Sequence, residues 1–204
     1  RISMQGGQTL AACEVRVPAD LSSAAFVILA AVLADNADIK ILNVGVNSSR
    51  TGVIDILKAM GADISLENPQ LLGKEPVADI RVRSSVLQGG KIVPGLVSLA
   101  IDEFPVLFVA AAAARGKTEF SGIGELRVKE SDRISAMAEG MRILGIEVDE
   151  TTDGAVVHGG RFDGGTVQSH GDHRVAMSLA VAASIASDTV MIDDVGSVDT
   201  SFPG

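Results

Sequence analysis

The chain has 204 residues, of which 47% are hydrophobic, and its formal net charge is -9. This length and hydrophobic content allow one large domain or two small domains with a substantial core. The chain contains no Trp or Tyr, only six Phe, and an excess of acidic residues, so base stacking and nucleic-acid binding are not expected.

One cysteine, Cys13, excludes an internal disulfide and fits a reducing, cytoplasmic location. We expect this cysteine to be buried as a small apolar side chain rather than to act as a reactive thiol. The longest apolar runs, Ala24–Ala34 and Phe104–Ala114, are shorter than the roughly 20 residues that cross a bilayer, so we expect no membrane span. The first residues, Arg1 to Met4, resemble neither a signal peptide nor a translation start, and we expect a longer parent protein.

Three aspartates, each directly before an apolar segment of helical length, indicate a threefold internal repeat. A second polar helix start follows each aspartate at the same spacing, without gaps. The aspartates are Asp20, Asp102 and Asp172, and the second starts are Ser48, Glu130 and Thr200. Two copies then end in matching glycines, Gly61 and Gly145. We predict a single domain with repeats at about 12–84, 90–160 and 164–204.

The first helix of each repeat has almost no polar face. These helices are predicted at Ser23–Ala34, Pro105–Ala114 and Val175–Ala186. Helices that are apolar on all sides are buried on all sides, and their many alanines permit close packing. We therefore place three parallel helices at the centre and sheets outside them. Asp20 or Ser22 is expected to cap the first helix by accepting a hydrogen bond from its first turn.

The second helix is amphipathic and is flanked by strands. Strands are predicted at Cys13–Val17, Ile39–Val44, Asp63–Glu67, Ala78–Arg83, Thr118–Ile123, Glu147–Asp149, Ala155–His158 and Val190–Asp193. Turn-rich surface connections are predicted at Pro69–Pro76, Gln88–Gly95 and Gly159–Gly165. Each complete repeat is thus a strand-helix-strand-helix-strand-strand unit of an α/β fold. The third repeat is expected to be truncated, without its second helix and at least one strand.

Three parallel helices would present their N-termini on one face, where free N–H groups and the helix dipoles attract anions. Candidate site residues gather at these starts: Asp102, Arg127, Lys129, Glu130, Arg133, His173 and Arg174. Arginine can bind a phosphate or carboxylate through two hydrogen bonds. Carboxylates beside such arginines are the groups needed to move protons on an anionic substrate.

Each feature also has a purely structural interpretation. The charged segment Arg127–Arg133 could be a capped helix with surface ion pairs, either Lys129 with Asp132 or Glu130 with Arg133. Asp102 could be a plain N-cap, and His173 could bond to the nearby backbone.

We expect neither a metal nor a cofactor. The histidines, His158, His170 and His173, lack metal-ligand spacing and a thiolate companion. The pair Gly122 and Gly124 lacks the third glycine of a dinucleotide fingerprint.

Four motifs, in this order and spacing, resemble one known family. They are Ile101-Asp-Glu-Phe-Pro105, Val128-Lys-Glu-Ser-Asp-Arg133, Gly171-Asp-His-Arg-Val-Ala-Met177 and Thr200-Ser-Phe-Pro203. From about residue 12 to its end, the chain resembles the C-terminal half of the 5-enolpyruvylshikimate-3-phosphate synthases (3-phosphoshikimate 1-carboxyvinyltransferases). That resemblance implies an inside-out α/β barrel domain in a two-domain enzyme of the shikimate pathway. The active site would lie between the domains.

The resemblance also implies substrates and roles. Phosphoenolpyruvate would give its enolpyruvyl group to the 5-hydroxyl of shikimate-3-phosphate, with release of phosphate and without a cofactor. Catalysis would use Asp102 and Glu130; shikimate-3-phosphate would contact Asp102 and Lys129; phosphoenolpyruvate would contact Arg133 and Arg174. His173 and Arg127 are further candidates, and the division of proton transfers between the two carboxylates stays open.

The chain departs from the family pattern at Thr200, where some members have a lysine, and at Pro18-Ala-Asp20, where a glycine is usual. The family's N-terminal Lys-Ser signature and Ser-x-Gln contacts are absent. We therefore expect a missing N-terminal half as partner and no activity from this fragment alone. Two alternatives stay open: a UDP-N-acetylglucosamine enolpyruvyl transferase domain, and a non-catalytic anion-binding or regulatory module. A binding module would have no need of both Asp102 and Glu130.

Overall fold

The structure, a computed structural model, describes residues 3–202. Its α-helices are α1 (Leu21–Leu33), α2 (Gly52–Ala59), α3 (Phe104–Ala113), α4 (Arg133–Ile143), α5 (His173–Ala183) and α6 (Val198–Ser201). Its strands are β1 (Asp38–Gly45), β2 (Asp63–Leu72), β3 (Glu75–Arg83), β4 (Lys117–Ser121), β5 (Val148–Thr151), β6 (Gly154–His158), β7 (Gly165–Gln168) and β8 (Val190–Asp193).

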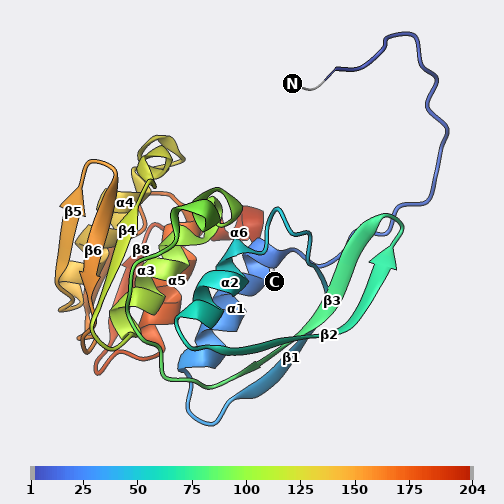
Figure 1. Ribbon diagram of the computed structural model, residues 1–204. Coiled ribbons are helices and arrows are strands. Elements are labelled where there is room, and N and C mark those ends of the chain that lie inside the picture. Colours follow the sequence, from blue (N-terminus) through green and yellow to red (C-terminus); the bar gives the residue numbers. More distant parts are fainter. Residues whose placement is uncertain (1–2, 203–204) are drawn as a thin grey trace.

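Helices α1, α3 and α5 contact one another at the centre of the fold, as predicted (Figure 1). Nine of the ten residues of α3 are buried, because it is apolar on every side. The rings of Phe104 and Phe108 both pack on Phe120 of β4, with centroids 5.4 and 5.1 Å apart. Each fully buried Leu or Phe side chain contributes roughly 1.5–3 kcal/mol to folding. This core fixes the positions of the helix ends.

The three central helices run parallel. At one end, a cavity of about 350 Å³ is lined by Leu33 and Ala113, from the ends of α1 and α3, and by Ile185, just beyond α5. At the other end, the helix starts are joined by hydrogen bonds, for example from Ser22 Oγ to the Glu103 carboxylate. The predicted layout of parallel buried helices is confirmed, and their N-termini share one face.

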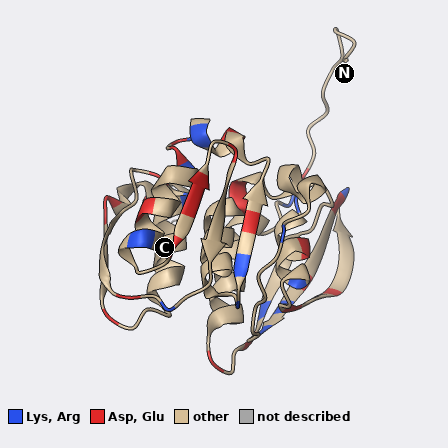
Figure 2. Cartoon of the chain, turned by 60° about the vertical axis from the view of Figure 1, so that its left-hand side comes forward, with Lys and Arg blue, Asp and Glu red and all other residues tan. Residues whose placement is uncertain are grey.

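Sheets lie outside the helices. The antiparallel sheet β1-β3-β2 lies on one side and the antiparallel sheet β4-β6-β5 on the other, while β7 and β8 form a parallel pair (Figure 1). Charged residues lie mainly on strands, turns and helix ends, and the central helices α1 and α3 carry none (Figure 2). The glycines Gly61 and Gly145 match, as predicted: both follow a second helix and have positive φ values, 100° and 83°.

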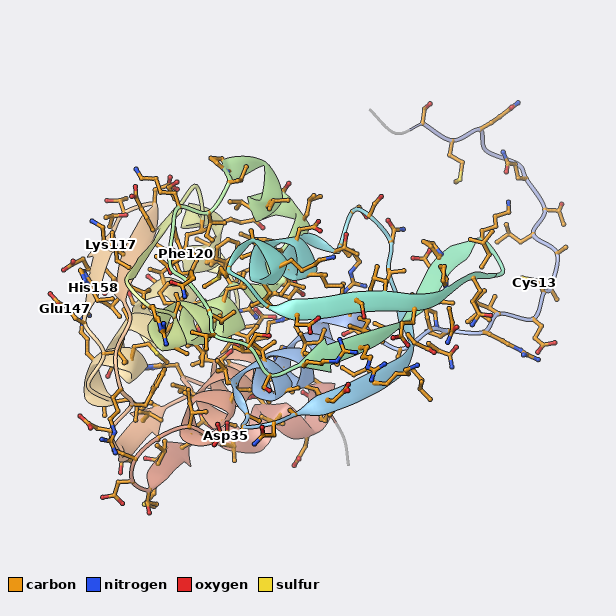
Figure 3. The ribbon with its side chains drawn as sticks, turned by 60° about the horizontal axis from the view of Figure 1, so that its bottom comes forward. Cys13, Asp35, Lys117, Phe120, Glu147 and His158 are labelled. Carbon is orange, nitrogen blue, oxygen red and sulfur yellow. The ribbon has the colours of Figure 1, made fainter. Side chains whose placement is uncertain are left out.

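The predicted strand Cys13–Val17 is not formed. This segment is extended and exposed, and the nearest pairing is an isolated bridge between Ala19 and Val44. An alternating pattern forms a strand only where a partner strand accepts its hydrogen bonds, and none of residues 3–202 does so. The expectation that Cys13 is buried is also wrong, since its thiol is exposed on this segment, away from the helices (Figure 3).

The predicted surface connection Pro69–Pro76 is mostly strand. β2 continues to Leu72 across an irregularity between Glu67 and Gln70, and a turn at Gly73 leads into β3. Pro69 lies in that irregularity, where a strand tolerates a missing N–H. β7 was not predicted, because four residues at the edge of a glycine-rich segment give too short a pattern. Pro203 of the fourth motif lies outside the described residues.

Within residues 3–202, no helix has the length and hydrophobicity needed to cross a membrane.

Candidate active site

The aspartates at the first helix starts differ in what they bind. Asp20 accepts a hydrogen bond from the Ser23 N–H at 2.9 Å, and Asp172 accepts one from the Arg174 N–H at 2.9 Å. Both therefore cap their helices, as expected of Asp20. Asp102 does not: it lies in a 3₁₀ turn, and the residue before α3 is Glu103. Helix α3 therefore begins two residues after its aspartate, whereas α1 and α5 begin one residue after theirs.

Asp102 is a half-exposed carboxylate between two cations. Its Oδ1 lies 3.5 Å from Nη1 of Arg133 and 3.7 Å from Nζ of Lys129. An N-cap would have its oxygens engaged by the first helical turn, whereas those of Asp102 face charged side chains. The structural interpretation of Asp102 as a plain cap is wrong, and its carboxylate is available for chemistry.

Arg133, the first residue of α4, is buried among carboxylates. Its side chain is 1% exposed, Nε donates to Asp172 at 2.8 Å, and Nη2 donates to Glu130 at 2.6 Å. The predicted pair of Glu130 with Arg133 is present, but it belongs to a buried centre and is not a simple surface pair. Burial raises the pKa of Asp172, but the hydrogen bonds and charge of Arg133 outweigh this and lower its pKa below 3.8.

Arg174, in the first turn of α5, has a guanidinium group that is only partly used. Its Nη1 donates to the backbone carbonyl of Asp102 at 3.0 Å and lies 3.6 Å from the Glu103 carboxylate. The hydrogen bonds within residues 3–202 involve neither Nε nor Nη2 of this side chain. Those two nitrogens form the fork that grips a carboxylate or phosphate.

Lys129 donates to Glu125 at 2.7 Å and approaches Asp102, and its hydrogen bond to Glu125 raises its pKa, so it stays charged. The alternative pairing of Lys129 with Asp132 is not found. Asp132 is paired instead with Arg127 at 2.8 Å.

Arg127 links the start of α4 to the outer sheet. It also donates to the backbone carbonyl of Thr152 at 3.0 Å, beside the end of β5, which fixes the start of α4 to the outer sheet. Its guanidinium makes none of its contacts with Asp102 or Glu130.

His173 is half-buried and lines a cavity of about 240 Å³ together with Asp20, Ser22 and Arg174. Burial lowers its pKa, and the charge of Arg174 lowers it further, so the imidazole is neutral at pH 7. The suggested hydrogen bond from His173 to nearby backbone is not among those in the described part of the chain.

The family profile of EPSP synthase (3-phosphoshikimate 1-carboxyvinyltransferase) matches residues 1–204. The chain belongs to the EPSP synthase family. A 3-phosphoshikimate 1-carboxyvinyltransferase of Xanthomonas oryzae pv. oryzae is 54% identical over 201 residues, and one of Xylella fastidiosa is 52% identical over 202 residues. These matches cover 98% and 99% of this chain but 46% and 44% of the relatives. The chain therefore spans about half the length of the curated relatives it matches.

Solved structures agree with this assignment. An EPSP synthase from Acinetobacter baumannii superposes with a TM-score of 0.93 at 45% identity, covering 98% of this chain and 49% of that one. The enolpyruvyl transferase NikO from Streptomyces tendae superposes with a TM-score of 0.65 at 17% identity, covering 89% of this chain and 40% of that one. This likeness supports the fold alone. The fold is an enolpyruvyl transferase-like α/β fold, with helices inside and sheets outside.

Two side chains at the site of this EPSP synthase family member were missed from the sequence. Glu103 is 7% exposed at the start of α3, and Ser22 donates to it from α1. Burial raises the pKa of Glu103, although the hydrogen bond from Ser22 and the charge of Arg174 oppose that shift. The sequence signal for Glu103 was the acidic pair Asp102-Glu103 directly before a wholly apolar helix, but the sequence motif singled out only Asp102.

One group within residues 3–202 has the spacing to hold a metal ion: Glu147, Asp149 and His158. It lies on the outer sheet, where Figure 3 shows Glu147 and His158 at the edge of the molecule. His158 Nε2 is already 3.1 Å from Asp149. Exposed carboxylates there are typical of a solvated sheet face, and the cluster has no link to the helix starts.

Proposed function

We propose that this chain is one domain, about half, of a 3-phosphoshikimate 1-carboxyvinyltransferase. The complete protein transfers the enolpyruvyl group of phosphoenolpyruvate to the 5-hydroxyl of shikimate-3-phosphate and releases phosphate, in aromatic amino-acid biosynthesis in the cytoplasm. The observation that carries this proposal is Asp102, a carboxylate at a helix start that caps nothing and lies between Arg133 and Lys129. The proposed reaction comes from the family to which the chain belongs. The position of Asp102 between two cations suits proton transfer on an anionic substrate.

The reaction needs proton transfers at two places. The 5-hydroxyl oxygen bonds to C2 of phosphoenolpyruvate and loses its proton, while C3 gains one, giving a tetrahedral intermediate. That intermediate then loses phosphate from C2 and a proton from C3. We assign Asp102 and Glu130 to these transfers, because both carboxylates are about half exposed and face the cations that hold the reactants.

The cations divide between the substrates. Arg174 offers Nε and Nη2 to phosphoenolpyruvate, and Lys129 offers its ammonium to shikimate-3-phosphate. Arg133 already contacts three carboxylates, so a bound phosphoenolpyruvate would replace Glu130 or Asp102 at one nitrogen. Exchange with Glu130 would free that carboxylate for proton transfer while keeping Arg133 neutralised. The helix N-termini add to the attraction for both anionic substrates.

The remaining contacts come from the sequence that relatives carry beyond the matched half. Positioning two substrates against each other supplies a large part of catalysis. We therefore expect this chain alone to show no measurable transfer, and the full-length protein to be active. Turnover by the purified chain, free of host enzyme, would contradict the proposal that the site is shared.

The two carboxylates test the chemistry in the full-length protein. Asp102→Asn and Glu130→Gln keep shape and hydrogen-bonding capacity but cannot exchange a proton. Turnover should fall about 10²–10⁴-fold, with much smaller changes in substrate affinity. Asp149→Asn, on the outer sheet, is the matched control and should leave turnover unchanged.

An unchanged rate in both site variants would remove these carboxylates from the mechanism and favour an anion-binding module. A coupled assay that offers either shikimate-3-phosphate or UDP-N-acetylglucosamine as acceptor separates the two transferase activities. Transfer to the second acceptor alone would refute the proposed substrate.

A further inference from the structure

A chain of polar contacts crosses the three helix starts and ends at Arg174: hydrogen bonds link Arg50 to Ser22 and Ser22 to Glu103, and an ion-pair contact links Glu103 to Arg174. It begins at Arg50, before α2, passes through Ser22 of α1 and continues to Glu103 at the start of α3. Nη2 of Arg50 lies 3.0 Å from Ser22 Oγ, and Nη1 of Arg174 lies 3.6 Å from Oε1 of Glu103. Each repeat therefore contributes to one continuous contact path.

The direction of these hydrogen bonds is fixed by the donors. Arginine can only donate, so Ser22 Oγ accepts from Arg50 and gives its own proton to Glu103. Oε1 of Glu103 is then an acceptor toward Ser22 and also faces Nη1 of Arg174. The Glu103 side chain is 8% exposed, so this oxygen lies in a mostly buried side chain.

Proposed contacts to phosphoenolpyruvate use the opposite edge of Arg174. Nη1 is occupied by the carbonyl of Asp102 and by Glu103, which leaves Nε and Nη2 without a hydrogen bond among residues 3–202. A long arginine side chain loses rotamer freedom when it binds a ligand, and a fixed Nη1 reduces that loss. Holding Nη1 in place therefore reduces the rotamer entropy that Arg174 loses when Nε and Nη2 bind a ligand.

We propose that Glu103 is a positioning residue for Arg174, holding its guanidinium through Oε1 so that the free fork can bind the anionic groups of phosphoenolpyruvate. This inference rests on the proposed function, because it concerns the same substrate. What Glu103 supplies is an oxygen in a fixed place, which accepts a hydrogen bond from Ser22 and lies 3.6 Å from Nη1 of Arg174. Its negative charge would weaken binding of an anion, and burial raises the pKa of this carboxyl.

Two substitutions of similar volume separate acceptor from charge in the full-length protein. Glu103→Gln removes the charge but keeps an oxygen that can accept from Ser22 and Arg174. Glu103→Met keeps the volume and removes the acceptor. By calorimetry, the Kd for phosphoenolpyruvate should rise about threefold to tenfold in Glu103→Met and stay within about twofold of wild type in Glu103→Gln.

Three controls exclude a general structural effect. Glu103→Gln should unfold near the wild-type temperature, and Glu103→Met should lose only a modest amount of stability while remaining folded, because Ser22 loses its acceptor. Affinity for shikimate-3-phosphate should not change in either. In an Arg174→Ala background, Glu103→Met should cause no further loss, because the residue acts through Arg174.

Equal phosphoenolpyruvate affinities in the Gln and Met variants would overturn the positioning role, as would an undiminished effect of Glu103→Met without Arg174. Absence of phosphoenolpyruvate binding by the wild-type protein would overturn it as well. Binding without transfer to shikimate-3-phosphate would instead count against the proposed function and leave the Glu103 result valid.

Discussion

Two aspartate–arginine pairs at helix starts have the same chemistry in different surroundings. Asp20 caps α1 and pairs with Arg50 at 3.1 Å, with both side chains about half exposed. Asp172 caps α5 and pairs with Arg133 at 2.8 Å, with side chains 0% and 1% exposed. Burial, and not residue type, decides what each pair does.

The buried pair contacts the proposed catalytic carboxylates directly, whereas the exposed pair is linked to the site only through Ser22 and Glu103. Arg133 reaches past Asp172 to Glu130 and Asp102, the two carboxylates that we assign to proton transfer. The side-chain hydrogen bonds of Arg50 within residues 3–202 go to Asp20 and Ser22. An exposed pair contributes little to stability, while breaking a buried pair leaves an uncompensated charge in the interior.

Removing the arginine from each pair should therefore have very different effects on stability. Arg133→Ala should lower the free energy of unfolding by about 3–5 kcal/mol, because Asp172 remains buried without its partner. Arg50→Ala should lower it by no more than about 1 kcal/mol. Urea unfolding of both variants of the full-length protein measures this. Similar losses would show that burial does not distinguish the pairs.

The cation beside the buried pair, Lys129, tests whether that region binds substrate. Lys129→Ala should weaken shikimate-3-phosphate binding roughly tenfold to a hundredfold, equal to about 1.5–3 kcal/mol, with a smaller effect on phosphoenolpyruvate. Arg174→Ala should show the opposite preference. Lys91→Ala, a lysine far more exposed than Lys129, is the matched control. Equal losses for both substrates in Lys129→Ala would contradict the assignment.

The sequence predicted the elements that depend on local pattern. The apolar helices, the Asp20 cap and the matching glycines follow from periodicity and backbone chemistry, and the structure confirms them. The strand at Cys13–Val17 failed because strand formation depends on a partner, which one-dimensional alternation does not contain.

The candidate site was predicted as residue types and not as geometry. Its charged residues were recognisable, but the burial of Arg133 and the exposure of Asp102 depend on how three separate helices meet. Glu103 was missed because its role comes from contacts with Ser22 and Arg174, both about seventy to eighty residues away along the chain. Long-range contacts of this kind leave no local signature.

Lowering the pH should remove the small contribution that the exposed Asp20–Arg50 pair makes to the free energy of unfolding. Burial raises the pKa of Asp20, but hydrogen bonds from Ser23 and the charge of Arg50 outweigh it, and the pKa falls below 3.8. A carboxylate whose pKa is lower in the folded state stabilises the fold above its unfolded pKa, and this contribution disappears as the pH falls through the folded value. The contribution of Asp20 should thus be complete at pH 5 to 7 and vanish below about pH 3.8.

Asp20→Asn isolates this contribution, because asparagine caps a helix about as well as aspartate but cannot pair with Arg50 as a charge. At pH 7 the variant should be less stable than wild type by about 0.2–1 kcal/mol, and the difference should shrink toward zero as the pH falls below about 3.8. Urea unfolding across this range gives the difference directly. At pH 7, Asp172→Asn should cost more, because it leaves Arg133 buried without its full complement of charge. Absence of a deficit in Asp20→Asn at pH 7 would show that this aspartate acts only as a cap, and a deficit as large as that of Asp172→Asn would mean that exposure does not weaken the pair.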